Sequence, residues 1–308
     1  MSRFFIIDGN SLVHRSYHAV PKHFRSASGE PTNAVFGFVS ILLGMLEQEK
    51  PDYVAVAFDK KGPTFRHAMM GEYKGTRVKT DDDLIVQFPR VREVLNTLNI
   101  PIFEKDGLEA DDFLGIMAQE LESKHPEVQL FIVTSDQDAL QLVSEQTQVV
   151  SPVKGYSEVK RYDAAAVKEK LGVWPHQVAD FKGLRGDSSD NIPGVPGIGP
   201  KTAVSLLEQY GSLENLYAHL EEVESPAVRE KLRAHEGDAR LSKEVASILR
   251  FDPDFALHLD TCVMHDFDVD AVRQLFETLA FKAHLKRLEG LNMAWQKKRE
   301  EERQPSLF

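Results

Sequence analysis

Four short apolar runs in the first half of the chain each lead into acidic residues. The runs are residues 4–7, 53–58, 101–103 and 130–133, and helical patterns separate them. Continuous apolar runs of this length are typical of strands that are buried on both faces of a parallel sheet. Because ligand sites in such sheets lie beyond the carboxyl ends of the strands, the acids after these runs are predicted to share one edge.

The acids that follow the four runs are candidate metal ligands. They are Asp8, Asp59, Glu109, Asp111, Asp112, Asp136 and Asp138. Each has a structural alternative, because an acid can also cap a helix or brace a turn. Together they would repel one another, since two like charges about 4 Å apart cost roughly 1 kcal/mol even in water. Divalent cations are the natural compensation, and without a His or Cys cluster the ligand set favours Mg²⁺, with Mn²⁺ as a substitute, over zinc.

Residues 182–203 add two more acids and a candidate phosphate-binding turn. Asp187 and Asp190 precede a glycine-rich turn that opens a predicted helix at residues 200–210. Gly197 and Gly199 would let this turn approach a phosphate, and Lys201 adds positive charge at the helix N-terminus. The structural alternative is a plain helical hairpin that needs glycine for its geometry. Nine acids are too many for one Mg²⁺ ion and suit two, the arrangement that hydrolyses phosphodiester bonds.

The remaining pattern predicts an α/β protein with a helical second part. Residues 33–49, 84–98 and 110–124 read as helices that cover a mostly parallel sheet, and residues 148–150 and 159–161 as a hairpin at its edge. After residue 163 only helices are expected. We therefore predict a catalytic domain at 1–163, a helical DNA-binding subdomain at 164–290 and a polar, solvated tail at 291–308. The helices expected in the second part are residues 164–171, 175–182, 200–210, 213–220, 228–234, 239–249 and 269–288.

Residues 60–92 are predicted to form a lid or arch over the site. The first part of this segment has little apolar period and carries the basic residues Lys60, Lys61, Arg66, Lys74, Arg77 and Lys79, with Phe65 and Tyr73 among them. A basic segment with aromatic side chains between a sheet end and a helix suits contact with a nucleic-acid strand. The alternative is a solvated loop.

The charge and the cysteine content indicate which partners and which cellular compartment are compatible with this chain. The net charge is −11, yet without the nine acids 39 acidic residues face 37 basic ones, so local basic patches remain available for DNA. The one cysteine, Cys262, cannot form an internal disulfide and fits a reducing compartment. No apolar run approaches the roughly 20 residues that span a bilayer. A cytoplasmic, nucleoid-associated protein is expected, with no membrane partner.

Six motifs in order resemble the 5′-nuclease, or flap endonuclease, family, and most of all the 5′→3′ exonuclease domain of bacterial DNA polymerase I. They begin at Asp8, Phe58, Tyr73, Glu109, Thr134 and Gly186 and belong to a likeness over about residues 1–290. The resemblance implies a PIN-like core, a helical arch and a helix–three-turn–helix that holds duplex DNA. All nine acids match its metal ligands, for two ions per site.

The resemblance also implies roles for other residues. Lys74 and Arg77 match cations that steady the scissile phosphate, and Tyr73 matches a base-stacking aromatic. The DNA-binding set is Arg66, Gly197, Gly199, Lys201 and Thr202, and a K⁺ ion held by backbone carbonyls is implied near residues 195–198.

The expected function is a Mg²⁺-dependent, structure-specific nuclease that removes 5′ flaps and RNA primer ends. The alternatives are a PIN-type ribonuclease, against which the helical DNA-binding segment weighs, and a branched-DNA-binding protein that does not cut, which would have lost acids. The last five residues resemble a sliding-clamp docking peptide through Gln304, Leu307 and Phe308. A stand-alone monomeric nuclease is expected, because the chain ends without a polymerase domain.

Overall fold

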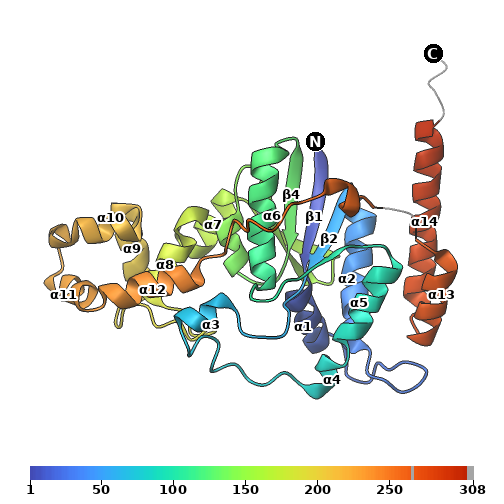
Figure 1. Ribbon diagram of the computed structural model, residues 1–308, viewed down its shortest axis with the longest axis horizontal. Coiled ribbons are helices and arrows are strands. Elements are labelled where there is room, and N and C mark those ends of the chain that lie inside the picture. The colour runs from blue at the N-terminus through green and yellow to red at the C-terminus, as the bar shows by residue number, and fades with distance from the viewer. Residues whose placement is uncertain (265–266, 304–308) are drawn as a thin grey trace, which may run out of the picture.

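A six-stranded, mostly parallel sheet forms the centre of the protein (Figure 1). The computed structural model describes residues 1–264 and 267–303, with side chains up to residue 293. The order across the sheet is β3-β2-β1-β4-β5-β6, and only β6 runs antiparallel, beside β5. The strands are β1 Ser2–Asp8, β2 Tyr53–Ala57, β3 Ile102–Phe103, β4 Val128–Val133, β5 Thr147–Lys154 and β6 Glu158–Tyr162. The predicted strands and the edge hairpin are confirmed.

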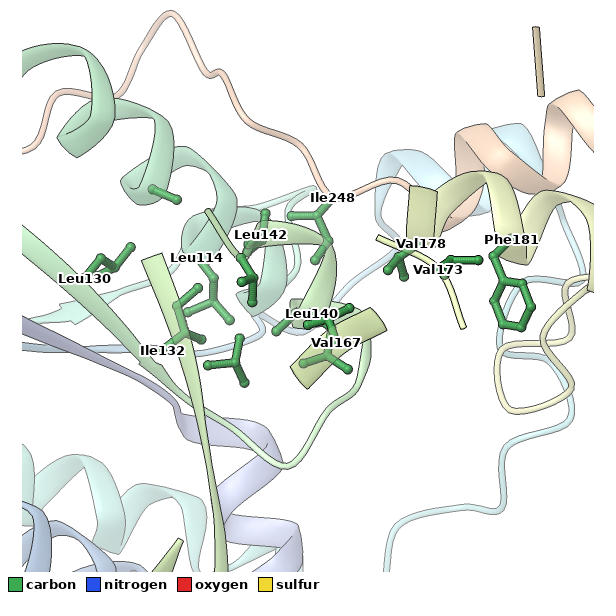
Figure 2. Close-up of a cluster of buried hydrophobic side chains, with 14 of the residues drawn as sticks. Leu114, Leu130, Ile132, Leu140, Leu142, Val167, Val173, Val178, Phe181 and Ile248 are labelled. Atoms are coloured by element: carbon green, nitrogen blue, oxygen red, sulfur yellow. The ribbon is translucent and has the colours of Figure 1, made fainter. Parts of the chain in front are cut away.

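Alternating side chains along the central strands divide the interior into two cores. In β1, Phe4 and Ile6 face one core, while Phe5 and Ile7 face the other. The first core continues through α6 (Ala110–Lys124) into the helical part, and Figure 2 shows Leu114, Ile132 and Val167 within it. Since both faces of the strands are covered, their sequences are apolar without interruption.

The second core lies under helices from both ends of the chain. It contains side chains of α1 (Gly9–Ala19), α2 (Asn33–Glu49) and α5 (Phe88–Thr97). It also contains residues of α13 (Val269–Thr278) and α14 (Lys282–Arg303), which lie on the opposite side of the sheet from α9–α12 in Figure 1. Residues 267–291 therefore pack with the sheet layer, although the sequence places them after the helical segment.

The helical part extends from the other side of the sheet. It consists of α7 Ala164–Leu171, η2 Pro175–Gln177, α8 Val178–Arg185, α9 Pro200–Tyr210, α10 Leu213–Ala218, η3 Leu220–Glu222, α11 Pro226–Ala234 and α12 Glu236–Ala246. Its apolar side chains join the first core without a break. One further turn, η4 (Leu259–Cys262), lies beside β2 before the chain crosses to α13. No helix within residues 1–264 and 267–303 combines the length and apolar character needed to cross a membrane.

Several predicted helix boundaries differ in the structure: the helix expected at 269–288 is divided into α13 and α14, the one at 239–249 corresponds to α12, and the one at 175–182 to η2 and α8. Two further differences concern residues 84–98 and the tail. The helix expected at 84–98 is divided into α4 (Asp82–Ile85) and α5, because Pro89 at the start of α5 has no N–H to continue the earlier helix. The expected polar tail is helical as far as Arg303, within α14. The proposed docking residues Gln304, Leu307 and Phe308 lie outside the described residues.

The segment proposed as an arch contains α3 (Phe65–Met69), α4 and an irregular stretch, residues 70–81, between them. Its central turn packs on the helical part, where Tyr73 joins a small cluster with Ile192, Val245 and Ala246. The backbone N–H of Lys74 donates to the carbonyl of Asp190 at 2.9 Å. These contacts hold the central turn of the segment beside Asp190, one of the two acids that precede the glycine-rich turn.

Candidate active site

The carboxyl ends of β1, β2 and β4 meet the N-terminus of α6 and the end of α8 around one cleft of about 840 Å³. Seven of the nine predicted acids line this cleft: Asp8, Asp59, Glu109, Asp111, Asp136, Asp138 and Asp187. Lys74 and Arg77 line it as well. The shared acidic edge expected from the strand pattern is thus present, and it lies opposite cations of the proposed arch.

Asp8 and Asp59 are held in place by hydrogen bonds from the protein. Asp8 is buried and caps α1, accepting from the backbone N–H of Ser11 at 2.9 Å and from the Thr134 hydroxyl at 2.7 Å. Burial, together with the charges of Asp136 and Asp59, raises the pKa of Asp8 to about 7. Burial also raises the pKa of Asp59, which accepts from the backbone N–H of Ala110 at 2.7 Å.

Repulsion between neighbouring carboxylates affects the pKa values of Asp111 and Asp138. Burial raises the pKa of Asp111 well above its usual value, and the charges of Asp136, Asp8 and Asp138 raise it further. Burial likewise raises the pKa of Asp138 to about 6, against the opposing effect of Lys182. These shifts report concentrated negative charge, which a divalent cation relieves.

The donors around the cleft fit hard cations that retain water. All seven acids offer oxygen, the ligand type of Mg²⁺ and Mn²⁺. Among the described residues, no three His, Cys, Asp or Glu side chains are arranged so that they could hold a metal ion by themselves. Mg²⁺ keeps several waters and binds few carboxylates directly, so an open acidic cleft is compatible with it.

Lys182 is a cleft residue to which the sequence analysis gave no role. It lies in the last turn of α8, and its ammonium donates to a carboxylate oxygen of Asp138 and to Oδ2 of Asp187, the latter at 2.5 Å. Although burial opposes the shift, the charge and hydrogen bond of Lys182 lower the pKa of Asp187 to about 2. The sequence signal for this contact was a lysine at the end of a predicted helix, five residues before Asp187.

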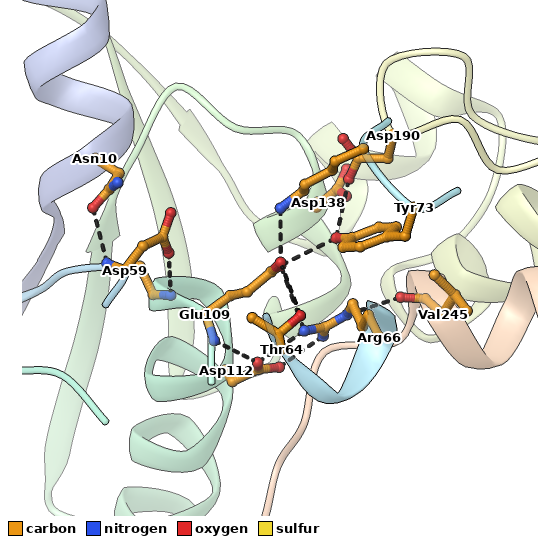
Figure 3. A network of polar contacts seen from close by, with 12 residues as sticks. Asn10, Asp59, Thr64, Arg66, Tyr73, Glu109, Asp112, Asp138, Asp190 and Val245 are labelled. Carbon is orange, nitrogen blue, oxygen red and sulfur yellow. Dashed lines mark hydrogen bonds and ion pairs between the residues drawn. The ribbon is translucent and has the colours of Figure 1, made fainter. Parts of the chain in front are cut away.

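The arch cations each pair with a predicted metal ligand. Lys74 Nζ lies 2.9 Å from Glu109 Oε2, and Arg77 Nη2 lies 2.5 Å from Asp190 Oδ1 (Figure 3 shows Glu109 and Asp190). The side chain of Arg77 is 51% exposed, so it can exchange its partner for a phosphate. Both cations therefore lie in the cleft wall beside predicted metal ligands, and their role at the scissile phosphate stays a prediction.

The structure corrects the role predicted for Arg66. Its guanidinium is buried, where it donates to both oxygens of Asp112 at 2.7 and 2.8 Å and to the backbone carbonyls of Val245 and Ser247 (Figure 3 shows Arg66, Asp112 and Val245). Its fifth N–H points to Glu109 Oε2 at 3.5 Å, so no donor is left for a DNA phosphate. Asp112, in turn, is fully buried and also accepts from the backbone N–H of Glu109, so it stabilises α6 and does not line the cleft.

Tyr73 and Asp190 also differ from their predicted roles. Tyr73 is only 4% exposed, and its hydroxyl donates to Glu109 at 3.1 Å, with Asp190 3.4 Å away. A ring buried in this way has no free face for a base, so base stacking by Tyr73 is not supported here. Asp190 is not among the residues that line the cleft, and its carboxylate accepts hydrogen bonds from Arg77 and Tyr73.

One face of α1 forms a further wall of the cleft. His14, Arg15 and His18 line it together with Asn10 and Ser11. The helical spacing of residues 10, 14 and 18 was a signal for this face that the sequence analysis did not use. Arg15 also donates to the carbonyl of Val153 at 2.6 Å, which fixes the helix against β5.

The turn before α9 has the geometry that its glycines predict. Gly194 and Gly197 have φ angles of 62° and 80°, and a Cβ on Gly194 would lie 2.1 Å from the backbone nitrogen of Gly186. Gly199 faces open space, and Lys201 is exposed in the first turn of α9, beside the partly exposed Thr202. The helix N-terminus is therefore open to an anion.

Comparisons with known proteins identify the family. A family model described as "5'-3' exonuclease, N-terminal resolvase-like domain" matches residues 3–172, and one described as "5'-3' exonuclease, C-terminal SAM fold" matches residues 173–270. The chain belongs to the 5′-3′ exonuclease family. The two family models meet between residues 172 and 173. The domain boundary predicted from the sequence lies at residue 163, and it stays a prediction.

Relatives of this 5′-3′ exonuclease family member include DNA polymerase I from Caldicellulosiruptor bescii, 43% identical over 285 residues, and from Bacillus subtilis, 42% identical over 283 residues. The matches cover 92% of this chain but only 33% and 32% of those proteins, so the chain spans about a third of their length.

Solved structures confirm the fold. The 5′-exonuclease of bacteriophage T5, solved with zinc, has a TM-score of 0.66 at 20% identity and covers 94% of this chain and 98% of its own. The catalytic core of Rad2 in complex with DNA substrate has a TM-score of 0.62 at 18% identity and covers 94% and 91%.

Proposed function

We propose that this chain is a divalent-metal-dependent nuclease that hydrolyses phosphodiester bonds at 5′ ends and 5′ flaps of duplex DNA. The observation that carries the proposal is the cleft in which seven acids from separate elements face Lys74 and Arg77. Membership of the 5′-3′ exonuclease family supports it. Two solved structures of the same fold, one with bound divalent ions and one with DNA substrate, support the metal and the substrate class.

The cleft acids would hold two Mg²⁺ or Mn²⁺ ions. When bound, such ions lower the pKa of a water that attacks phosphorus and stabilise the leaving oxygen. The protein's own contribution is to place the acids on fixed strand and helix ends and, within the described residues, to leave Asp8, Asp59 and Asp111 without a salt-bridge partner. Lys74 and Arg77 bind the scissile phosphate by exchanging Glu109 and Asp190 for its oxygens.

The turn before α9 would hold the duplex away from the cut. Lys201 and Thr202 present donors at a helix N-terminus, which suits a phosphate of one strand. The proposed K⁺ ion would bind carbonyls of residues 195–198, where Lys231 already donates to the Gly197 carbonyl at 3.2 Å. A K⁺ ion at that carbonyl would have to displace the Lys231 ammonium.

A 5′-labelled flap oligonucleotide annealed to a template tests the proposal. Cleavage near the junction that needs Mg²⁺ and stops with a chelator is expected. Cleavage of single-stranded RNA in preference to the flap would favour the PIN-type ribonuclease instead. Tight binding of the flap without cleavage in Mg²⁺ or Mn²⁺ would favour the alternative that the protein holds branched DNA without cutting it.

Two partner assignments accompany the proposal. The chain acts as a monomer on RNA–DNA primer junctions. Residues 304–308 dock it on a sliding clamp, and burial of the Leu307 and Phe308 side chains contributes about 1.5–3 kcal/mol each to the binding free energy. Deleting residues 304–308 should leave cleavage of free flaps unchanged and abolish clamp binding in calorimetry. Equal clamp binding by the truncated and intact chains would remove the docking assignment, and light scattering measures the oligomeric state.

A further inference from the structure

The two sides of the cleft differ in how their charge is balanced. On the side of β1, β2 and α6, the described residues give Asp8, Asp59 and Asp111 no salt bridge within 4 Å. Asp8 and Asp59 are held by neutral donors, namely Ser11, Thr134 and the backbone N–H of Ala110. Among the described residues on that side, the salt bridges to cleft acids go to Glu109, from Lys74 and Arg66, and leave Asp8, Asp59 and Asp111 without a cation in direct contact.

On the side of α8, a protein cation already lies among the acids. The ammonium of Lys182 bonds both Asp138 and Asp187, and the Lys182 side chain is only 9% exposed. The two acids come from different parts of the fold, since Asp138 begins the 3₁₀ helix η1 (Asp138–Leu142) after β4 and Asp187 follows α8. Lys182 thus joins the sheet edge to the helical part.

We propose that Lys182 is an internal counter-cation that makes the divalent ion at Asp138 and Asp187 the more weakly bound of the two. This inference rests on the proposed two-ion function and deepens it. An ion that needs the oxygens held by Lys182 must displace the ammonium, whereas an ion beside Asp8 and Asp111 finds, in the part of the chain that the structure describes, no ammonium or guanidinium bonded to those carboxylates. Lys182 is a positioning residue in this account, because it acts through the two acids.

The lysine side chain can accommodate both states. Its four-carbon stem allows the ammonium to withdraw while α8 stays in place, because the helix is fixed independently against α12 and the first core. Without a second ion, Lys182 relieves the repulsion between Asp138 and Asp187. With the ion, the carboxylates would bind the metal in place of the amine.

Mn²⁺ binding without DNA tests the inference directly. Titration followed by electron paramagnetic resonance counts bound ions in wild type and in Lys182→Met. We expect one tighter and one weaker site in wild type, and in the variant a weaker site that tightens about tenfold or more, since a neighbouring positive charge is removed. The tighter site should change less than the weaker one.

Lys243→Met provides a matched control. Lys243 also pairs with two acids, Asp180 at 2.6 Å and Glu214 at 2.7 Å, but outside the cleft lining. This variant removes an equivalent charge and two equivalent bonds, so it should leave both Mn²⁺ affinities unchanged. Equal tightening by both variants would mean a general charge effect and would overturn the role of Lys182.

The remaining outcomes separate this inference from the proposed function. A weaker-site affinity in Lys182→Met within twofold of wild type overturns the inference alone. A wild-type protein that binds no Mn²⁺ overturns the two-ion function with it. If Lys182→Met fails to fold by circular dichroism, Lys182→Gln, which keeps a donor for one acid but no charge, should show the same tightening.

Discussion

Replacing Arg66 tests whether this arginine stabilises the fold or binds DNA. The guanidinium and the carboxylate of Asp112 are 3% and 0% exposed, and two hydrogen bonds of 2.7 and 2.8 Å join them. Two more donors reach the carbonyls of Val245 and Ser247. Arg66 therefore links α3 and α6 to the end of α12.

Arg66→Met should lower the free energy of unfolding by about 3–5 kcal/mol, because it leaves the buried carboxylate of Asp112 without its cation. At roughly 2.1 cal/mol/K per residue, the unfolding entropy of a 308-residue chain is about 0.65 kcal/mol/K, if the chain unfolds as one unit. The expected fall in Tm is then about 5–8 °C. Since α3 leads directly into the arch turn, cleavage should fall as well.

Thermal unfolding of the single variants Arg66→Met and Asp112→Leu and of the double variant provides the control. If the buried pair carries the effect, the double variant should be less destabilised than the sum of the single ones, because neither charge is left unpaired. The coupling between the two residues is expected to exceed about 1 kcal/mol.

A measurement of DNA binding by Arg66→Met could contradict the structural role of Arg66. Below its Tm, Arg66→Met should bind duplex DNA with an unchanged dependence of affinity on salt, since a buried guanidinium neutralises no phosphate. A salt slope reduced by about one unit, together with an unchanged Tm, would refute the structural assignment and restore the role in DNA binding predicted from sequence.

Four further outcomes follow from the same site. Asp111→Asn should abolish cleavage while flap binding in Ca²⁺ persists, and retention of more than about a tenth of the wild-type rate would exclude Asp111 from the metal site. Lys74→Ala should lower the single-turnover rate by roughly 10²–10³ and weaken binding much less, because its charge acts on the phosphate in the transition state. Lys201→Ala should do the reverse and reduce the salt slope by about one unit, measured by fluorescence anisotropy. Finally, burial raises the pKa of Asp8 to about 7 and of Asp138 to about 6. Between about pH 4 and pH 7 the unfolded chain releases these protons more readily than the folded protein does. The free energy of unfolding of the metal-free protein should therefore fall as pH rises through this range. Ca²⁺ should therefore raise Tm more at about pH 8 than at about pH 5.5, and an equal increase at both would show that these acids do not bind the ion.

The sheet and its acidic edge could be predicted because they depend on local pattern. Apolar runs set the strands, and acids that directly follow them must lie at the carboxyl edge of a parallel sheet. The helix at residues 200–210 was predicted to the residue, since Pro200 and Gly211 mark its ends. Family membership was likewise predicted from motifs that each occupy only a few residues.

The partners of buried charges could not be predicted, because they depend on contacts distant in sequence. Arg66 resembles the exposed cations of its basic segment, and only packing brings it to Asp112 and to the carbonyl of Val245, 179 residues away. Tyr73 is buried for the same reason, through Ile192 and Val245. The return of α13 to the face of α2 and α5 also depends on tertiary packing.

The structural and catalytic explanations of the acids turn out to be compatible, because a carboxylate has two oxygens. Among the residues that the structure describes, Asp59 accepts from the backbone N–H of Ala110 through Oδ1 alone, and Asp136 accepts from the backbone N–H of Asp138 through Oδ1 alone. One oxygen fixes a helix or turn, and the other is left for the cleft. Asp8 uses both oxygens in hydrogen bonds, yet both donors are neutral, so its charge still acts on an ion. Hydrogen bonds that fix the local backbone therefore also orient the charges of the site, which explains how acids from separate elements can act at one centre.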